Sequence, residues 1–207
     1  MCSRWGVSLA AWIALAAGAV GLAGLLRAQA LGGAGAAFKL TASAGFVALA
    51  LALRPETPFE RWILVGLCLS AGGDLLLLAT SRRGFLAGLV AFLLAHIAYA
   101  VAFATVAKPS PWTAAAIAGA TALALRWLWP HLGSMRLPVA AYCAAIGVML
   151  WLALGVGRLE IRLGGLLFWL SDLLVARHRF VRAEPLNRLA GLPLYYVGQY
   201  LIALAMA

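Results

Sequence analysis

Residues 84–106 read GFLAGLVAFLLAHIAYAVAFATV, a run without any Asp, Glu, Lys or Arg. A helix needs roughly 20 apolar residues to cross the hydrocarbon core of a bilayer. Because lipid offers the backbone no hydrogen-bond partner, a segment of this length and composition is expected to be a helix and not a strand. The run therefore predicts a transmembrane helix.

The rest of the chain repeats this pattern. Of its 207 residues, 65% are hydrophobic and only 11% are charged, whereas soluble domains are about half apolar and about a quarter charged. Charged residues and prolines divide the chain into eight apolar segments, over about residues 5–26, 36–53, 62–79, 84–106, 112–129, 137–156, 160–177 and 189–206. We expect an all-α fold, a polytopic membrane protein in which residues 1–207 form a single bundle of about eight transmembrane helices. A soluble enzyme, a disordered chain and a disulfide-stapled secreted module are excluded.

The cations lie mainly in the short connections between these segments. The net charge is +10, but the basic residues form no stripe with interleaved aromatics, so they indicate contacts with anionic lipid headgroups and no nucleic-acid partner. Segment 5–26 is too long for the core of a usual signal peptide and fits a first span. With eight spans the termini share one side, and the opposite side carries more Lys and Arg. The positive-inside rule then predicts a multi-pass protein of a bacterial-type inner membrane, with its termini outside and its basic loops in the cytoplasm.

Four ionisable residues lie well inside the apolar segments: Lys39, Asp74, His96 and Asp172. A charge at the centre of a bilayer costs about 2.5–3.5 kcal/mol even on lenient insertion scales, so such residues face the bundle interior or a cavity. A structural ion pair between Lys39 and one aspartate is an alternative, but one cation cannot neutralise two carboxylates. We therefore interpret the two aspartates as a candidate functional pair.

Both aspartates are expected in the basic-side half of the membrane. Asp74 precedes Arg82 by eight residues and Asp172 precedes Arg177 by five, and a helix rises about 1.5 Å per residue. Further polar side chains enter the same layer from the second and eighth segments: Lys39, Tyr195, Tyr196 and Gln199. Polar groups from several segments thus predict a cavity at one depth.

Segment 84–106 carries a stripe on one helical face, with spacings of three, four, four and three: Phe85, Gly88, Phe92, His96 and Tyr99. For His96 and Tyr99 two interpretations stay open, substrate binding and ordinary packing of a satisfied buried histidine. The same alternatives, substrate binding or interhelical hydrogen bonding, apply to Tyr195, Tyr196 and Gln199. Segments 5–26, 112–129 and 137–156 carry few polar residues and are interpreted as scaffold or lipid-facing wall.

Two carboxylates at one depth support general acid–base catalysis when one is protonated and the other ionised. A wall of low polarity favours the first state, and a nearby cation such as Lys39 favours the second. Amide hydrolysis, proton-coupled transport and hydrolysis of an acid-labile ether all use such a pair. Intramembrane aspartyl proteases match weakly, because Gly72-Gly73-Asp74 and Leu192-Pro193-Leu194 only approximate their Gly-x-Gly-Asp and Pro-Ala-Leu elements.

Read in order, the polar elements resemble the lysoplasmalogenase family of eight-span membrane proteins, also called the YhhN family. These elements are Lys39, Gly73-Asp74-Leu75-Leu76, the stripe from Phe85 to Tyr99, Phe168-x-x-Ser171-Asp172, and Tyr195-Tyr196-x-x-Gln199. The resemblance extends from Ala37 to the C-terminus. Leu40 follows Lys39 where the family pattern has a proline, a departure that concerns the local backbone there.

The resemblance implies hydrolysis of the vinyl ether bond of a lysoplasmalogen, a 1-alkenyl glycerophosphocholine or glycerophosphoethanolamine, to a fatty aldehyde and the glycerophospho-alcohol. Asp74 and Asp172 are then the catalytic acid and base, in an order that the sequence leaves open. The substrate-binding residues are expected to be Lys39, His96, Tyr99, Tyr195, Tyr196 and Gln199. The partners are this lysophospholipid and the membrane lipids.

A vinyl ether is hydrolysed by protonation of its β-carbon followed by attack of water, so neither a metal nor another cofactor is expected. The dispersed cysteines Cys2, Cys68 and Cys143 predict neither a disulfide framework nor a zinc site. There is no Gly-x-Ser-x-Gly element, and Ser171 adjoins Asp172 with no histidine expected at that level, so no activated ester-cleaving nucleophile is predicted.

A proton-coupled membrane carrier is the alternative from another class, with Asp74, His96 and Asp172 as relay sites. Carriers usually have central helices broken by Gly or Pro. Here the prolines lie mainly at segment ends, which favours a fixed cavity and hence the enzyme.

Overall fold

The computed structural model describes residues 8–30 and 35–207, and within them the chain forms eight α-helices and no strand. The helices are α1 (Leu9–Ala30), α2 (Ala36–Ala52), α3 (Pro58–Leu76), α4 (Arg82–Ala104), α5 (Pro111–Leu128), α6 (Arg136–Gly155), α7 (Leu159–Ala176) and α8 (Pro185–Leu204). Two short 3₁₀ turns join α5 to α6, and a π-helical turn, η3 (Arg177–Val181), follows α7. The all-helical prediction is confirmed. The predicted start of the first segment at Trp5 lies outside the described residues.

The helices begin at polar capping residues, which locate their first residues more accurately than the charged residues and prolines that divide the sequence into segments. The α3 helix begins at Pro58, four residues before the predicted start at residue 62, because Thr57 and Glu60 form a reciprocal capping box around Pro58. The hydroxyl of Ser81 accepts the backbone N–H of Gly84 at 3.0 Å and starts α4 at Arg82.

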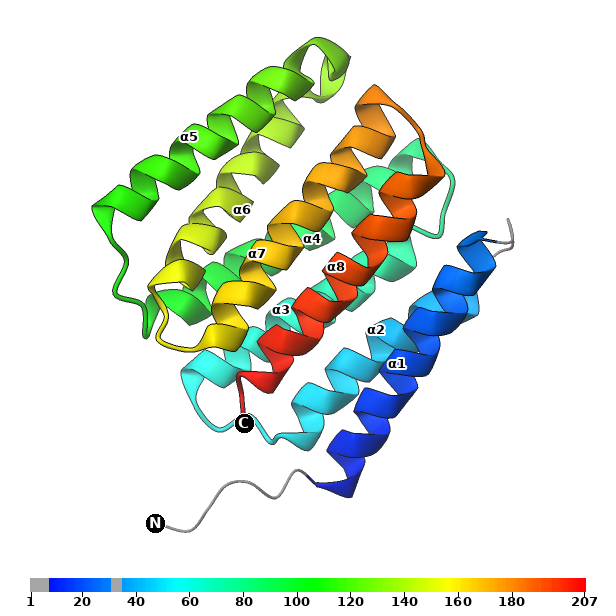
Figure 1. Cartoon of the computed structure of the whole chain (residues 1–207), viewed down its shortest axis with the longest axis vertical. Helices are drawn as coiled ribbons and strands as arrows, with labels where there is room; N and C mark the ends of the chain where they lie inside the picture. Colours follow the sequence, from blue (N-terminus) through cyan, green and yellow to red (C-terminus); the bar gives the residue numbers. More distant parts are fainter. Residues whose placement is uncertain (1–7, 31–34) are drawn as a thin grey trace.

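The helices pack as neighbouring pairs around α8 (Figure 1). The α1–α2, α3–α4 and α7–α8 pairs have the most extensive contacts, and α8 also touches α1, α2 and α3, whereas α5 packs outside against α6. Gly164 and Gly198 permit the α7–α8 approach, since a Cβ at either position would lie 2.9 Å from the carbonyl oxygen of the other. The start of α1 and the C-terminus lie at the same end of the bundle. The central position of α8 brings its polar residues against three other helices.

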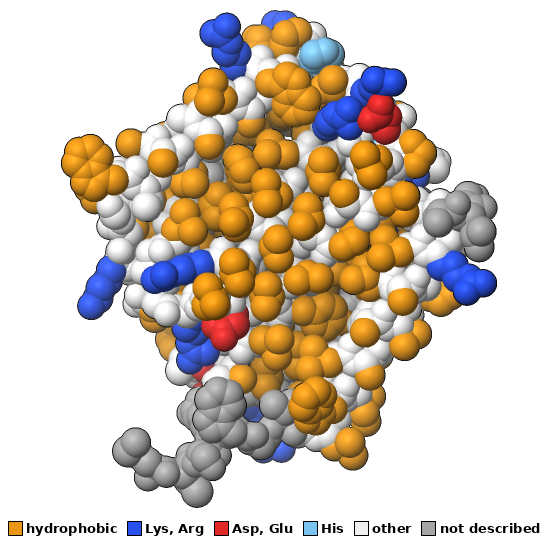
Figure 2. All heavy atoms as spheres, in the orientation of Figure 1, with side chains coloured by type: hydrophobic (Ala, Val, Ile, Leu, Met, Phe, Trp, Pro, Cys, Tyr) orange, Lys and Arg blue, Asp and Glu red, His pale blue; other side chains and the backbone are white. Residues whose placement is uncertain are grey.

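The surface of the bundle is apolar and part of its interior is polar. Large hydrophobic side chains such as Trp12, Leu94 and Ile97 are exposed, while Asp74, His96 and Gln199 are buried. Figure 2 shows hydrophobic side chains covering the middle of the visible face, with charged side chains toward its two ends. Among the described residues, three helices are long and apolar enough to cross a membrane, at Leu9–Gln29, Arg82–Ala104 and Gly133–Gly155. This distribution is that of a membrane protein; the number of helices that span the bilayer stays a prediction.

Candidate active site

Asp74 of α3 is the centre of a buried polar cluster. Its Oδ1 lies 3.1 Å from the Nζ of Lys39, and its Oδ2 accepts hydrogen bonds of 2.7 Å from the hydroxyls of Ser43 and Tyr195. The Asp74 side chain is only 4% exposed and that of Lys39 16%. Both carboxylate oxygens are thus occupied, by one cation and two hydroxyl donors.

The local sequence explains this cluster. Lys39 and Ser43 are four residues apart on α2 and therefore lie on one helical face. The hydroxyl of Tyr196 donates to the carbonyl oxygen of Lys39 and lies 3.2 Å from the Ser43 hydroxyl, so α8 closes the cluster from the other side. Of the predicted site residues, the structure brings Lys39, Asp74, Tyr195 and Tyr196 together here.

Asp172 of α7 lies in a second cluster with residues of α4 and α6. Its Oδ2 accepts a 2.7 Å hydrogen bond from the hydroxyl of Tyr142 and lies 3.5 Å from the Nε2 of His96. The Asp172 side chain is 17% exposed, whereas that of His96 is fully buried. In the described part of the chain no Lys or Arg pairs with Asp172. This carboxyl group therefore differs from Asp74 in both partners and accessibility.

The tautomer of His96 follows from its own hydrogen bond. The Nδ1 atom lies 2.7 Å from the carbonyl oxygen of Phe92. A carbonyl can only accept, so Nδ1 carries a hydrogen and the neutral ring leaves Nε2 as a lone-pair acceptor. This Nε2 is buried and makes no hydrogen bond to any of the described residues, but it faces Asp172.

The two carboxyl groups are connected through aromatic rings. Tyr195, which binds Asp74, packs against Phe168 with ring centroids 5.4 Å apart, and Phe168 packs against His96 at 4.5 Å. Phe92 contacts both Tyr195 and Phe168. No hydrogen bond or ion pair among the described residues joins the two aspartates directly. The sequence predicts one polar layer around the two aspartates. In the structure each aspartate has its own cluster, and the two clusters touch through aromatic rings.

Tyr99 and Gln199 form a third, fully buried set with Ser70. The hydroxyl of Tyr99 donates to Gln199 Oε1 at 2.6 Å, and Gln199 Nε2 donates to Ser70 Oγ at 3.2 Å. The three groups satisfy one another and join α4, α8 and α3. A role for Tyr99 and Gln199 in substrate binding stays a prediction.

The sequence analysis missed three residues of these clusters: Ser43, Ser70 and Tyr142. Ser43 could have been found, because it lies one helical turn after Lys39. Tyr142 lies in a segment that was interpreted as scaffold or lipid-facing wall. For Tyr142 this interpretation is wrong, because its hydroxyl binds Asp172. The expectation that no histidine lies at the level of Asp172 is also wrong, because α4 packs against α6 and brings His96 beside it.

Ser171 nonetheless has no partner of the kind a nucleophile needs. Its hydroxyl is buried without a hydrogen bond to the described residues, and the Nε2 of His96 faces the neighbouring Asp172. A serine nucleophile requires a base within hydrogen-bond reach of its own hydroxyl.

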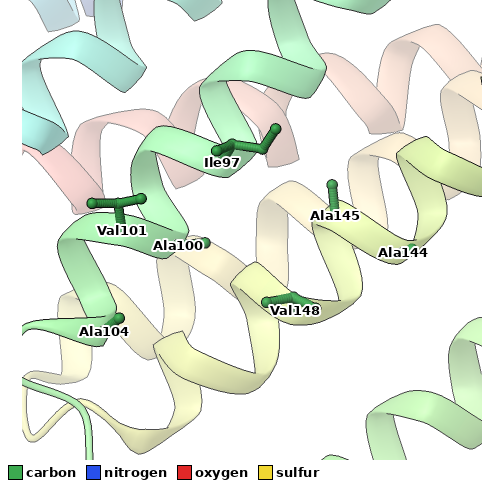
Figure 3. A pocket seen from close by; sticks show the side chains of 7 residues that line it. All are labelled: Ile97, Ala100, Val101, Ala104, Ala144, Ala145 and Val148. Atoms are coloured by element: carbon green, nitrogen blue, oxygen red, sulfur yellow. The ribbon is translucent and has the colours of Figure 1, made fainter.

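An outward-facing apolar groove lies between α4 and α6 (Figure 3). It has a volume of about 430 Å³ and is lined by Ile97, Ala100, Val101, Ala104, Ala144, Ala145 and Val148. None of these side chains can exchange a proton, so the groove itself offers neither an acid nor a base.

No three His, Cys, Asp or Glu residues within the described ranges come together as a metal site would require. Cys68 and Cys143 are free thiols, and Cys2 lies outside those ranges.

Comparison with known proteins identifies the family to which the chain is similar. The profile of the YhhN family matches residues 34–206. Lysoplasmalogenase of Mycobacterium tuberculosis is 36% identical over 157 residues, covering 70% of this chain and 59% of that protein. Human lysoplasmalogenase TMEM86A is 35% identical over 161 residues, with 72% and 66% covered, and human lysoplasmalogenase TMEM86B is 33% identical over 164 residues, with 74% and 66% covered.

The chain thus spans 59% to 66% of the length of these three relatives. No solved structure matches it. The family profile covers Lys39, Asp74, His96, Asp172, Tyr195 and Tyr196. On the strength of that match over most of its length, the chain belongs to the YhhN family.

Proposed function

We propose that this protein is a lysoplasmalogenase, an ether hydrolase that cleaves the vinyl ether bond of 1-alkenyl glycerophosphocholine or glycerophosphoethanolamine. The products are a fatty aldehyde and the glycerophospho-alcohol. The observation that carries the proposal is the pair of intramembrane carboxyl groups held in contrasting settings, Asp74 against an ammonium group and Asp172 against a neutral imidazole. The names of the relatives support the same reaction.

The chemistry of a vinyl ether suits this pair. Protonation of the β-carbon gives an oxocarbenium ion, and water adds to that ion to form a hemiacetal. One carboxyl group donates the first proton, and the other carboxylate accepts a proton from the attacking water. Asp74 suits the second role, since the ammonium group of Lys39 lies 3.1 Å from it as the counter-charge of a carboxylate. The Tyr195 hydroxyl that donates to Asp74 connects this base to the aromatic layer around Phe168.

The position of the site suits a single-chain lipid. Asp172 lies five residues before Arg177, about 7.5 Å along the helix axis at 1.5 Å per residue. The basic turn η3, which begins at Arg177 and contains Arg179, offers positive charge to a phosphate, while the apolar flanks of the bundle can accommodate the hydrocarbon chain. We propose that the headgroup stays at this basic end, the ether bond reaches Asp172, and all eight helices span the membrane with their basic loops in the cytoplasm.

Selectivity between ether and ester tests the function. Detergent-purified protein is expected to release aldehyde from a 1-alkenyl lysolipid and to release little or no fatty acid from the 1-acyl lysolipid of equal chain length. Ester cleavage normally needs an activated nucleophile or a metal-bound hydroxide, and the described residues present neither. Aldehyde and fatty acid are quantified in parallel by mass spectrometry.

The acyl lysolipid also serves as an internal control. It shares the headgroup and tail, so it is expected to bind and to inhibit aldehyde release competitively. Release of fatty acid at a rate comparable to that of aldehyde would contradict the proposal and indicate a general lysophospholipase.

A further inference from the structure

The Nε2 atom of His96 faces a carboxylate oxygen of Asp172 and makes no hydrogen bond to the described residues. Nδ1 of His96 donates to the carbonyl oxygen of Phe92, so in the neutral ring Nε2 presents a lone pair. Oδ2 of Asp172 lies 3.5 Å from this Nε2. Two acceptors facing each other inside a bundle repel, and a proton shared between them removes the repulsion.

Tyr142 contacts the same carboxylate oxygen, Oδ2 of Asp172. Its hydroxyl donates to Oδ2 at 2.7 Å, and its ring lies edge-on to the imidazole of His96 with centroids 5.1 Å apart. Oδ2 is therefore held between a hydroxyl donor and an imidazole acceptor. In the described residues no hydrogen bond reaches Oδ1, and Asp172 is the more accessible of the two aspartates.

The titratable groups that face Asp172 are few. They are His96 of α4 and Tyr142 and Cys143 of α6, whereas α8 and η3 contribute none to the interactions of this carboxyl group in the described residues. Asp74 differs, because Lys39 and two hydroxyls already occupy both of its oxygens. The proton available for donation thus lies at Asp172.

We infer that Asp172 is the acid that protonates the substrate, that His96 is a positioning residue whose Nε2 accepts the carboxyl proton, and that Tyr142 is a positioning residue whose hydroxyl orients the same carboxyl group. This inference rests on the proposed vinyl ether hydrolysis and assigns its acid. His96 thereby acts through Asp172 and not as a contact to the lipid, and Tyr142 joins the site from a helix interpreted as scaffold.

The carboxyl proton of Asp172 passes to the β-carbon, where a C–H bond forms with the electron pair of the C=C bond, and the ether oxygen shares the positive charge left on the other carbon. Water adds to that carbon and gives a proton to Asp74, which forms the hemiacetal. When the hemiacetal splits, its hydroxyl proton returns to Asp172 and the glycerol oxygen takes the proton from Asp74. One water is consumed and both carboxyl groups regain their starting states.

Two nearly isosteric variants test the positioning role by kinetics. His96→Phe and Tyr142→Phe are each expected to lower kcat about 10- to 100-fold, the scale of one hydrogen bond to a charged or catalytic group. KM should change little, and the midpoint of the pH profile of kcat should move, because the surroundings of the acid have changed. Tyr200→Phe is the matched control, since it removes the hydroxyl of a half-buried tyrosine that binds only the carbonyl oxygen of Ala42, away from both aspartates.

The NMR spectrum of labelled histidine nitrogens tests the proton directly and needs no substrate. The chain contains only three histidines, so His96→Phe assigns the relevant signals. His96 should show a protonated Nδ1 and an Nε2 that accepts a hydrogen bond, and Asp172→Ala should shift Nε2 to the value of a free imidazole nitrogen while Asp74→Ala leaves it unchanged.

The experiments distinguish failure of the proposed function from failure of the assignment of Asp172 as the acid. If native protein releases no aldehyde, the proposed function fails, while the nitrogen spectrum still decides whether the proton is shared. If aldehyde is released but both Phe variants keep the native kcat and pH profile, or if both nitrogens of His96 are protonated, the assignment of Asp172 as the acid is overturned.

Discussion

Asp172→Asn is expected to reduce aldehyde release about 100- to 10,000-fold, the usual contribution of general acid catalysis, while leaving the fold intact. A carboxamide cannot give up a proton to carbon. Its oxygen can still accept the Tyr142 hydroxyl that Asp172 accepts at 2.7 Å, so the thermal unfolding temperature in detergent should stay near that of the native protein.

Asp74→Asn is the informative comparison. It should also lose activity, because it removes the proposed base, and it should be less stable than Asp172→Asn. The substitution leaves the ammonium group of Lys39, now 3.1 Å from a carboxylate oxygen, without its counter-charge. Asp74→Asn should therefore unfold at a lower temperature than Asp172→Asn. Near-native turnover in either variant would refute the paired-carboxylate mechanism.

Lys39→Met is expected to lower the free energy of unfolding by about 3–5 kcal/mol, the cost of removing one partner from a buried ion pair. Met keeps the length of the side chain but leaves the Asp74 carboxylate buried with only hydroxyl donors. Reversible unfolding in mixed micelles measures the change.

The double variant Lys39→Met with Asp74→Asn is the control for this prediction. With both charges gone, no uncompensated charge remains, so the double variant should be more stable than the sum of the two single losses implies. Strict additivity would show that Lys39 and Asp74 do not stabilise each other, and that the lysine ammonium lies in the interfacial water.

The helices could be predicted from the sequence because each apolar segment is long and its ends are marked by charge or proline. Their starts were less accurate: the capping box at Thr57 and Glu60 starts α3 before the apolar residues begin. A hydropathy pattern does not contain this local hydrogen bonding.

The ionisable residues of the site could be identified from the sequence, because such groups are rare in these apolar segments. Which of them lie together could not be predicted. The pairing of Lys39 with Asp74 and of His96 with Asp172 depends on which helices are neighbours. Tyr142 was missed for the same reason, since a lone tyrosine on an apolar segment gives no sign that α6 packs between α4 and α7. Helix spacing predicts which residues share a face, not which face meets which.

The destination of one solvent proton tests the central claim, hydrolysis of a vinyl ether by protonation at carbon, most directly. Native protein is incubated with a 1-alkenyl lysolipid in heavy water, and the aldehyde is reduced at once to the alcohol so that it cannot exchange through its enol. Mass spectrometry should then find one deuterium on the carbon next to the former carbonyl, because that C–H bond forms with a proton drawn from solvent through a carboxyl group. Aldehyde without deuterium at that carbon, or no aldehyde at all, would contradict the account.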